Sequence, residues 1–234
     1  MAELLTSIAT VATVDPRTGA VIAEHPAFDD ARIEAAVAGT HAAAAVWAAT
    51  PLPERLELLQ ALADTLRAGR DSYAALMTRE MGKPISEAVA EVEKCAATAD
   101  HYVAHATRIL ADEHVDIEGV RAWVAYEPLG VVYAVMPWNF PFWQVMRFAV
   151  PTLAAGNAVL LKHSPNVTGS ALAVQQVLER AGFPEGLLTT LVVAEADVPA
   201  VSDRIIADDR VAAVTLTGSN RAGAAVGAAA GRAV

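Results

Sequence analysis

Polar residues that could do chemistry follow three β-like runs in the second half of this 234-residue chain. Asn139 lies in Pro-Trp-Asn-Phe-Pro, Lys162 ends a run of apolar residues, and Gly218-Ser219 separates a strand-like run from a helix-like one. An amide can donate to a developing oxyanion, an ammonium can reach ribose hydroxyls or a phosphate, and N–H groups at a helix N-terminus bind pyrophosphate. As single residues, a helix-capping asparagine and a solvated surface lysine are the commoner interpretations. Three such groups at consecutive strand ends favour a ligand site.

Arg147 is the only charged residue between Glu127 and Lys162. A guanidinium in such an apolar stretch is costly unless it meets an anion or reaches the surface. The sequence leaves two interpretations open, a receptor for a substrate carboxylate and a structural ion pair or surface-seeking side chain. Arg147 lies eight residues after Asn139, about two turns at 3.6 residues per turn, so both side chains can face one pocket.

The elements that would position these residues change in kind near residue 115. Before it, a hairpin is expected over residues 1–27 with its turn at Asp15 to Gly19, and helices are expected at about 29–50, 51–69, 70–81 and 86–110. After it, strand-like runs at 120–126, 131–136, 158–161, 188–193 and 211–216 alternate with helices that begin near residues 142, 168, 198 and 220. This alternation predicts an α/β fold with an open parallel sheet. Gly223, Gly227 and Gly231 fall on one face of the last helix, where close packing on the sheet is expected.

The amino-acid composition indicates which classes of partner and which cellular compartment to expect. A net charge of −10 and a pI near 5.0 argue against a nucleic-acid partner or an anionic membrane surface. The most apolar stretch, residues 128–146, contains three prolines and does not suit a membrane span. The one cysteine, Cys95, allows no intramolecular disulfide, and the first basic residue is Arg17, so a cytoplasmic location is expected.

Four motifs in order and spacing resemble the aldehyde dehydrogenase superfamily, and most closely the bacterial NADP-dependent succinate-semialdehyde dehydrogenases. They are Pro-Trp-Asn-Phe-Pro, Ala-Gly-Asn-Ala-Val-Leu-Leu-Lys, Ala-Gly-Phe-Pro-Glu-Gly and Thr-Leu-Thr-Gly-Ser. The similarity runs from the N-terminal hairpin to Val234, about the first half of a family chain. It implies an N-terminal helical segment at residues 1–114, an oligomerisation-arm strand at 115–127, and an incomplete Rossmann-like NAD(P)-binding region at 128–234 that stops before the catalytic domain. Full-length members are expected to be homo-oligomers.

The resemblance also implies residue roles. Asn139 would be the oxyanion donor, and with Trp138 it would border the nicotinamide. Pro165 replaces a glutamate that accepts from the ribose in NAD-preferring members, so NADP is favoured and NAD remains possible. The other implied roles are the adenosine ribose loop (Lys162, His163, Ser164, Pro165), the pyrophosphate turn (Gly218, Ser219) and the substrate tunnel (Arg147 as carboxylate receptor, Phe140, Trp143).

The implied reaction is the oxidation of a short carboxylate-bearing aldehyde, succinate semialdehyde to succinate, through a cysteine thiohemiacetal and thioester. The family's nucleophilic cysteine and basic glutamate lie in Gly-Gln-x-Cys and Glu-Leu-Gly-Gly motifs, and neither motif occurs here. Cys95 lies in a predicted helix among charged residues and is expected to be structural. The chain alone is therefore expected to bind cofactor and substrate without oxidising the aldehyde.

Two alternatives remain. The chain could be a catalytically inactive nucleotide-binding remnant or interaction module, or a separate chain could supply the catalytic half. His101 and His105 are spaced i, i+4 on a helix, but no third ligand is evident, and no metal site is expected.

Overall fold

The computed structural model describes residues 9–233 and begins with a hairpin. Strands β1 (Thr10–Val14) and β2 (Val21–Pro26) pair antiparallel, and Gly19, with φ of 74°, makes the turn that closes them. The hairpin predicted around residues 15–19 is confirmed, and the part of that prediction covering residues 1–8 lies outside the described residues.

Four helices follow the hairpin. They are α1 (Asp30–Ala48), α2 (Leu52–Ala68), α3 (Arg70–Met81) and α4 (Ile85–Ile109). Asp29 caps α1 by accepting from the N–H of Arg32, and Gly82 ends α3 in the left-handed conformation with φ of 74°. All four helices lie within two residues of the predicted bounds, because caps and proline breaks are local signals.

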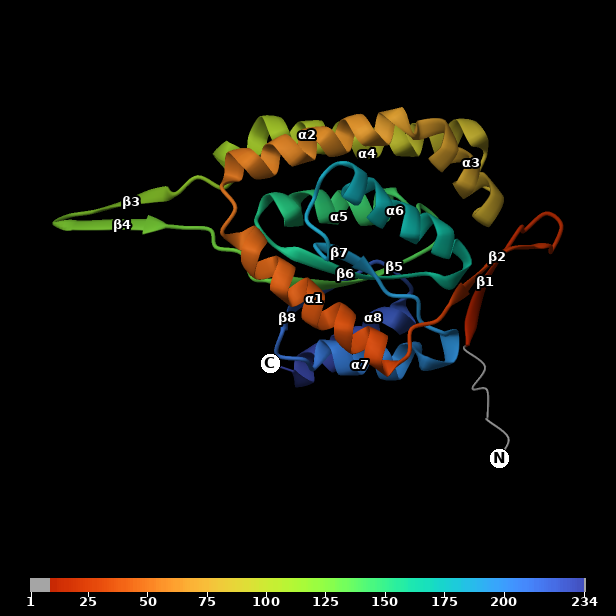
Figure 1. Cartoon of the computed structure of the whole chain (residues 1–234). Helices are drawn as coiled ribbons and strands as arrows, with labels where there is room; N and C mark the ends of the chain where they lie inside the picture. The colour runs from red at the N-terminus through yellow and green to blue at the C-terminus, as the bar shows by residue number, and fades with distance from the viewer. Residues whose placement is uncertain (1–8, 234) are drawn as a thin grey trace.

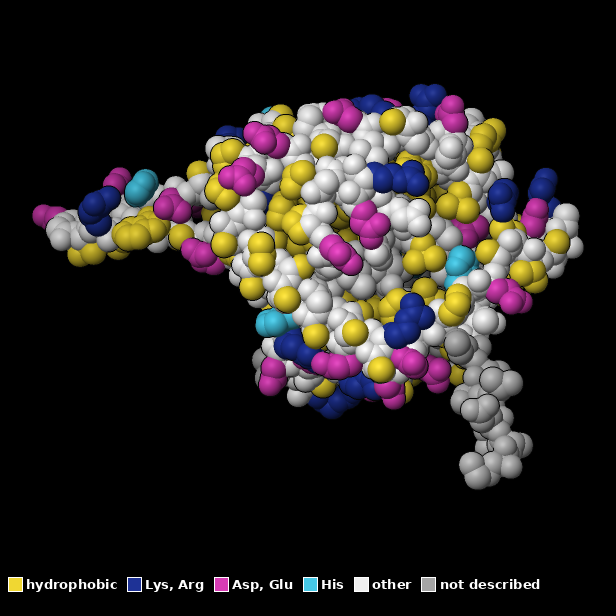
Figure 2. All heavy atoms as spheres, viewed as in Figure 1, with side chains coloured by type: hydrophobic (Ala, Val, Ile, Leu, Met, Phe, Trp, Pro, Cys, Tyr) yellow, Lys and Arg dark blue, Asp and Glu magenta, His cyan; other side chains and the backbone are white. Residues whose placement is uncertain are grey.

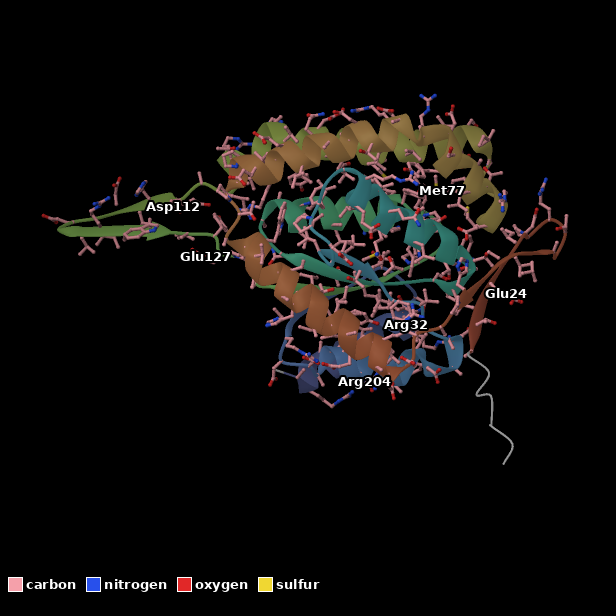
Figure 3. All side chains as sticks on the ribbon, viewed as in Figure 1. Glu24, Arg32, Met77, Asp112, Glu127 and Arg204 are labelled. Carbon is pink, nitrogen blue, oxygen red and sulfur yellow. The ribbon has the colours of Figure 1, made fainter. Side chains whose placement is uncertain are left out.

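A second hairpin projects from the body of the molecule. It consists of β3 (Glu113–Ile117) and β4 (Val120–Val124), whose side chains are almost all exposed. Figure 1 shows this arm extending well clear of the helices, and Figure 3 shows Asp112 and Glu127 at its base. Hydrophobic side chains gather along the arm (Figure 2), among them Trp123, which is 53% exposed. The two strands of the arm overlap the segment predicted at 115–127, begin two residues earlier and end three residues earlier, and the role of the arm in oligomerisation stays a prediction.

The central sheet has four parallel strands in the order β7-β6-β5-β8. They are β5 (Val131–Met136), β6 (Ala158–His163), β7 (Leu188–Thr190) and β8 (Val211–Leu216). The strands are connected by α5 (Trp143–Ala154), α6 (Thr168–Arg180) and α7 (Val198–Ile206), with short 3₁₀ turns η1 (Pro165–Val167) and η2 (Glu195–Asp197), and α8 (Asn220–Arg232) follows β8. The predicted α/β fold is confirmed, although β7 ends three residues earlier than expected.

Both faces of the sheet are covered by helices. Figure 1 shows α5 and α6 on one face, with α2, α3 and α4 stacked above them, and α1, α7 and α8 on the other face. The interior is apolar, and its largest buried side chain is Trp47, whose Nε1 donates to the carbonyl of Leu153 at 2.9 Å. Two-sided burial explains why β5 and β6 are continuous apolar runs rather than alternating ones.

The glycine face of α8 differs from the expectation. A Cβ added at Gly223 would come no closer than 3.9 Å to Leu216, and a Cβ added at Gly227 or Gly231 would have no neighbouring atom of the described chain within 4 Å. Gly223 therefore lies at ordinary contact distance from β8, whereas the predicted close packing on the sheet is wrong for Gly227 and Gly231.

Candidate functional site

The strand order creates a topological switch point at the carboxyl edge of the sheet. From β5 the chain moves to β6 and β7 on one side and then crosses back to β8 on the other side of β5, so the strand order reverses between β5 and β8. Open α/β sheets bind ligands at such a switch point. The two strand ends are joined by the N–H of Thr217, which donates to the carbonyl of Val135 at 3.1 Å. Asn139 follows β5 and Gly218 follows β8 at this edge.

Asn139 is exposed and does not cap the helix that follows it. The capping position of α5 is Phe142, which forms no side-chain capping bond. The N–H groups of Phe142 and Trp143 instead donate to Glu91 Oε1, at 2.9 and 3.0 Å. The interpretation of Asn139 as an ordinary helix cap is therefore wrong, and its exposed amide is available at the carboxyl edge of the sheet.

Arg147 is exposed on the first turns of α5. Its guanidinium donates to Thr217 Oγ1 at 3.2 Å, across from the end of β8. Within the described residues this partner is a neutral hydroxyl, so the alternative of a structural ion pair has no support there, whereas the exposure of Arg147 agrees with the alternative of a side chain that reaches the surface. The contact places Arg147 on the side of α5 that faces the switch point.

The aromatic residues beside Asn139 each have a defined neighbour. Trp138 and Phe140 are 49% and 43% exposed, whereas Trp143 is half-buried. The ammonium of Lys83 lies 3.7 Å from the centre of the Phe140 ring, and that of Lys94 lies 4.0 Å from the Trp143 ring. Cation–π contacts of this kind restrict the orientation of the rings.

The predicted ribose loop leaves the end of β6. Lys162 is half-buried, and burial lowers its pKa, although the nearby Glu195 carboxylate acts in the opposite direction. Ser164 donates from Oγ to Asn166 Oδ1 at 2.6 Å, and Pro165 begins η1. A partly desolvated ammonium favours an anionic or hydroxylated partner, which fits the predicted role of Lys162.

His163 is buried and bonded on both ring nitrogens. Its Nδ1 accepts from the N–H of Ser164 at 2.8 Å, so Nε2 carries the proton and donates to the carbonyl of Pro141 at 3.0 Å. Burial lowers the pKa of His163 to about 4, which keeps the ring neutral at physiological pH. The ring thus ties the end of β6 to the segment that carries Asn139, and its contribution to cofactor binding stays a prediction.

Two glutamates that the sequence did not single out occupy the N-termini of crossover helices. Glu91 accepts from the first N–H groups of α5, as described above. Glu80, on α3, accepts from the N–H groups of Gly169 and Ser170, both at 2.8 Å, and from Ser170 Oγ at 2.6 Å. Both glutamates are nearly fully buried, with exposed fractions of 2% for Glu80 and 3% for Glu91. A carboxylate at these positions satisfies the unpaired N–H groups and the helix dipole, so neither N-terminus can take a second anion.

The N-terminus of α8 differs from the N-termini of the three crossover helices α5, α6 and α7. The helix α7 is preceded by Glu195 and Asp197, which place negative charge at its start. By contrast, α8 is capped by Ser219, whose Oγ accepts from the N–H of Ala222 at 3.2 Å, and its first turn contains no acidic residue. Among the four described helices that follow strands of the central sheet, α8 is therefore the one whose N-terminus suits a phosphate.

Gly218 leaves space at that N-terminus. Its backbone is not left-handed, and a Cβ there would lie 3.6 Å from Leu216 and 3.7 Å from Ala222, which are ordinary contacts. The fold itself therefore does not require glycine at this position. A glycine without an internal steric reason fits a backbone that a bound group approaches closely.

A groove of about 670 Å³ lies between α7 and α8. Its walls are mainly apolar and include Val198, Pro199 and Val226. Arg221, in the first turn of α8, also lines the groove. A flat aromatic ring can be buried in such a groove while attached phosphates reach the start of α8.

The remaining candidates carry no chemistry. Cys95 is fully buried on α4, and burial raises the pKa of its thiol well above the usual range, so it is a poor nucleophile at neutral pH.

Among residues 9–233 no group of three or more potential metal ligands is found. No helix in that range has both the length and the apolar content that crossing a membrane requires, and the cytoplasmic location stays a prediction.

Comparison with known proteins decides the family. The model of the aldehyde dehydrogenase family matches residues 5–234. The chain belongs to the aldehyde dehydrogenase family. A probable succinate-semialdehyde dehydrogenase [NADP(+)] of Synechocystis is 44% identical over 220 residues, which cover 94% of this chain and 48% of that protein. Succinate-semialdehyde dehydrogenase [NADP(+)] 1 of Mycobacterium tuberculosis is 46% identical over 224 residues, with the same coverage.

Solved structures agree with this aldehyde dehydrogenase fold. The succinic semialdehyde dehydrogenase of Streptococcus pyogenes, in complex with NADP+, superposes with a TM-score of 0.90 at 34% identity, covering 95% of this chain and 48% of that one. A succinate-semialdehyde dehydrogenase of Burkholderia pseudomallei gives a TM-score of 0.90 at 31% identity, covering 97% of this chain and 46% of that one. The chain spans about half the length of the curated relatives it matches.

Proposed function

We propose that this chain is the cofactor-binding and substrate-recognising part of an NADP-preferring succinate-semialdehyde dehydrogenase. The observation that carries the cofactor site is the N-terminus of α8, which lies next to Gly218 at the switch point. Among the described helices that follow strands of the central sheet, it is the one whose N-terminus has no carboxylate beside it. The names of the relatives support NADP as the cofactor and succinate semialdehyde as the substrate.

The cofactor would extend from α8 toward Asn139. The first N–H groups of α8 and Gly218 would bind the pyrophosphate, and the groove between α7 and α8 would take the adenine. Lys162 would bind the adenosine ribose and its 2′-phosphate, because a phosphate compensates an ammonium that is partly removed from water. Pro165, where a carboxylate would repel a 2′-phosphate, leaves NADP the preferred form. NADP+ would supply the acceptor for the hydride that leaves the substrate.

Asn139 and Arg147 would act on the aldehyde. The exposed amide of Asn139 would donate to the oxygen that becomes an oxyanion when a thiolate attacks the carbonyl carbon. The guanidinium of Arg147 would bind the carboxylate at the other end of a short semialdehyde, exchanging its contact with Thr217 for a charged partner. Trp138, Phe140 and Trp143 would shape the space between these two groups.

Neither an accessible thiol nor the family's basic glutamate motif is present at this site in the described residues, since Cys95 is buried on α4. The chain alone is therefore expected to bind NADP+ and to form no NADPH from succinate semialdehyde. Isothermal titration with NADP+ and NAD+ tests binding, and NADPH absorbance tests turnover. Binding of neither dinucleotide would contradict the proposal, and so would turnover by the pure 234-residue protein.

The second candidate is an inactive nucleotide-binding remnant or interaction module. The observation that favours it is the burial of the only thiol in the chain. Sequencing the coding DNA beyond the Val234 codon separates the two candidates. An open frame encoding Glu-Leu-Gly-Gly and then Gly-Gln-x-Cys supports the dehydrogenase, and a stop codon there supports the remnant.

A further inference from the structure

A buried ion pair lies directly beneath the segment that carries Asn139. Lys83 and Glu91 are 5% and 3% exposed, and the Lys83 ammonium donates to Glu91 Oε2. The other carboxylate oxygen, Oε1, accepts from the N–H groups of Phe142 and Trp143. The same ammonium lies over the ring of Phe140, the residue next to Asn139.

The local fold brings Lys83 and Glu91 together. Gly82 ends α3 in the left-handed conformation, Lys83 follows it, and Pro84 precedes the start of α4. Glu91 lies on α4 eight residues after Lys83, about two helical turns further on at 3.6 residues per turn. The Lys83 side chain, from the turn between α3 and α4, therefore meets the Glu91 side chain, from the N-terminal half of α4, beside the start of α5.

The contacts hold the backbone that follows Asn139 from two sides. On one side, Lys83 contacts the Phe140 ring, and Glu91 accepts from the N–H groups of Phe142 and Trp143 at the start of α5. From β6, His163 Nε2 donates to the carbonyl of Pro141. Asn139 itself stays exposed, so its direction depends on this backbone rather than on contacts of its own amide.

We propose that Lys83 and Glu91 are positioning residues that fix the direction of the Asn139 amide by anchoring residues 140–143. The inference rests on the proposed role of Asn139 as the oxyanion donor. Glu91 acts through the N–H groups of Phe142 and Trp143. Lys83 neutralises the buried carboxylate and holds the Phe140 ring, so loss of either side chain releases the same segment.

The test uses the whole 234-residue chain labelled with ¹⁵N. The variants are Glu91→Gln, Lys83→Met and the conservative Lys83→Arg, which keeps the positive charge. Glu80→Gln is the matched control, because Glu80 is equally buried and bonds the N-terminus of α6 rather than that of α5. The readouts are the side-chain amide signals of Asn139, the indole signal of Trp138 and the exchange rates of the Phe142 and Trp143 amides.

We expect the Asn139 and Trp138 signals to shift in Glu91→Gln and Lys83→Met and to return toward the native positions in Lys83→Arg. Exchange of the Phe142 and Trp143 amides should become about tenfold faster or more in Glu91→Gln, since the oxygen that accepts from them loses its negative charge. Glu80→Gln should leave all of these signals in place. Unchanged Asn139 signals in the folded variants, or an equal shift in Glu80→Gln, would overturn the proposal.

Two further measurements cover the remaining outcomes. If the single variants do not fold, the double variant Glu91→Gln/Lys83→Met, which removes both charges together, is measured in the same way. In the unmodified chain, the Phe142 and Trp143 amides should exchange more slowly than those of Asn220 and Arg221 at the start of α8, and equal rates would overturn the inference. Titration of the unmodified chain with NADP+ tests the proposed function separately, so the two can fail independently.

Discussion

Gly218→Ala separates folding from cofactor binding at the start of α8. A Cβ at this position would lie 3.6 Å from Leu216 Cδ2 and 3.7 Å from Ala222 Cβ, both ordinary contacts, and the backbone is not left-handed. Alanine also restricts the unfolded chain, which stabilises a compatible site by about 0.4–1 kcal/mol. The free energy of unfolding should therefore stay the same or rise slightly.

The same methyl group should weaken NADP+ binding. A phosphate approaches backbone N–H groups to about 2.9 Å in charge-assisted hydrogen bonds, and a methyl group on Gly218 would hold it further away. Losing one such bond costs about 1.5–3 kcal/mol, which raises the dissociation constant roughly 10- to 150-fold. Isothermal titration measures the affinity, and thermal unfolding without ligand measures the stability of the same sample.

Gly227→Ala is the matched control, since Gly227 lies on the same helix with open space around it. It should leave NADP+ affinity unchanged and stabilise the helix by roughly 1 kcal/mol. The reasoning is refuted if Gly218→Ala binds NADP+ as tightly as the unmodified chain. It also fails if Gly218→Ala lowers the melting temperature, because the glycine would then have an internal structural reason.

Three further predictions test neighbouring parts of the site. Lys162→Met should weaken NADP+ binding in titration by about tenfold or more. It should also raise the free energy of unfolding at neutral pH, because burial lowers the Lys162 pKa and the resulting loss of stability disappears only when the pH exceeds the ordinary lysine pKa; a less stable variant would contradict this. Burial raises the Glu80 pKa, so its stabilising contribution is present in acid and is lost as the pH rises through the raised value. Urea unfolding should accordingly show the unmodified chain losing stability relative to Glu80→Gln as the pH rises above the ordinary glutamate pKa, and a gain in stability relative to Glu80→Gln would refute the sign. Arg147→Met should change the unfolding free energy by less than about 0.5 kcal/mol and leave NADP+ affinity intact, because Arg147 is exposed and is expected to meet the substrate rather than the cofactor; weaker NADP+ binding would argue against that.

The sequence alone determined the elements and their order. Caps such as Asp29, breaks such as Gly82 and Pro84, and the apolar runs of β5 and β6 act within a few residues, so the bounds of the helices and strands could be predicted closely. The motifs that carry Asn139, Lys162 and Gly218 are also local. Their placement at strand ends followed from the alternation of strands and helices.

Only the tertiary structure decided what the helix N-termini can bind. Glu91 is 51 residues from Phe142, and Glu80 is 90 residues from Ser170, so no local pattern shows that these carboxylates end at α5 and α6. Without knowledge of these two contacts, Asn139 can be interpreted as the cap of α5, and the N-termini of α5, α6 and α8 are equally good candidates for binding a phosphate. The burial of His163 and the open glycine face of α8 were hidden for the same reason. Burial and long-range hydrogen bonds depend on which surfaces meet, and the sequence of one segment does not contain that information.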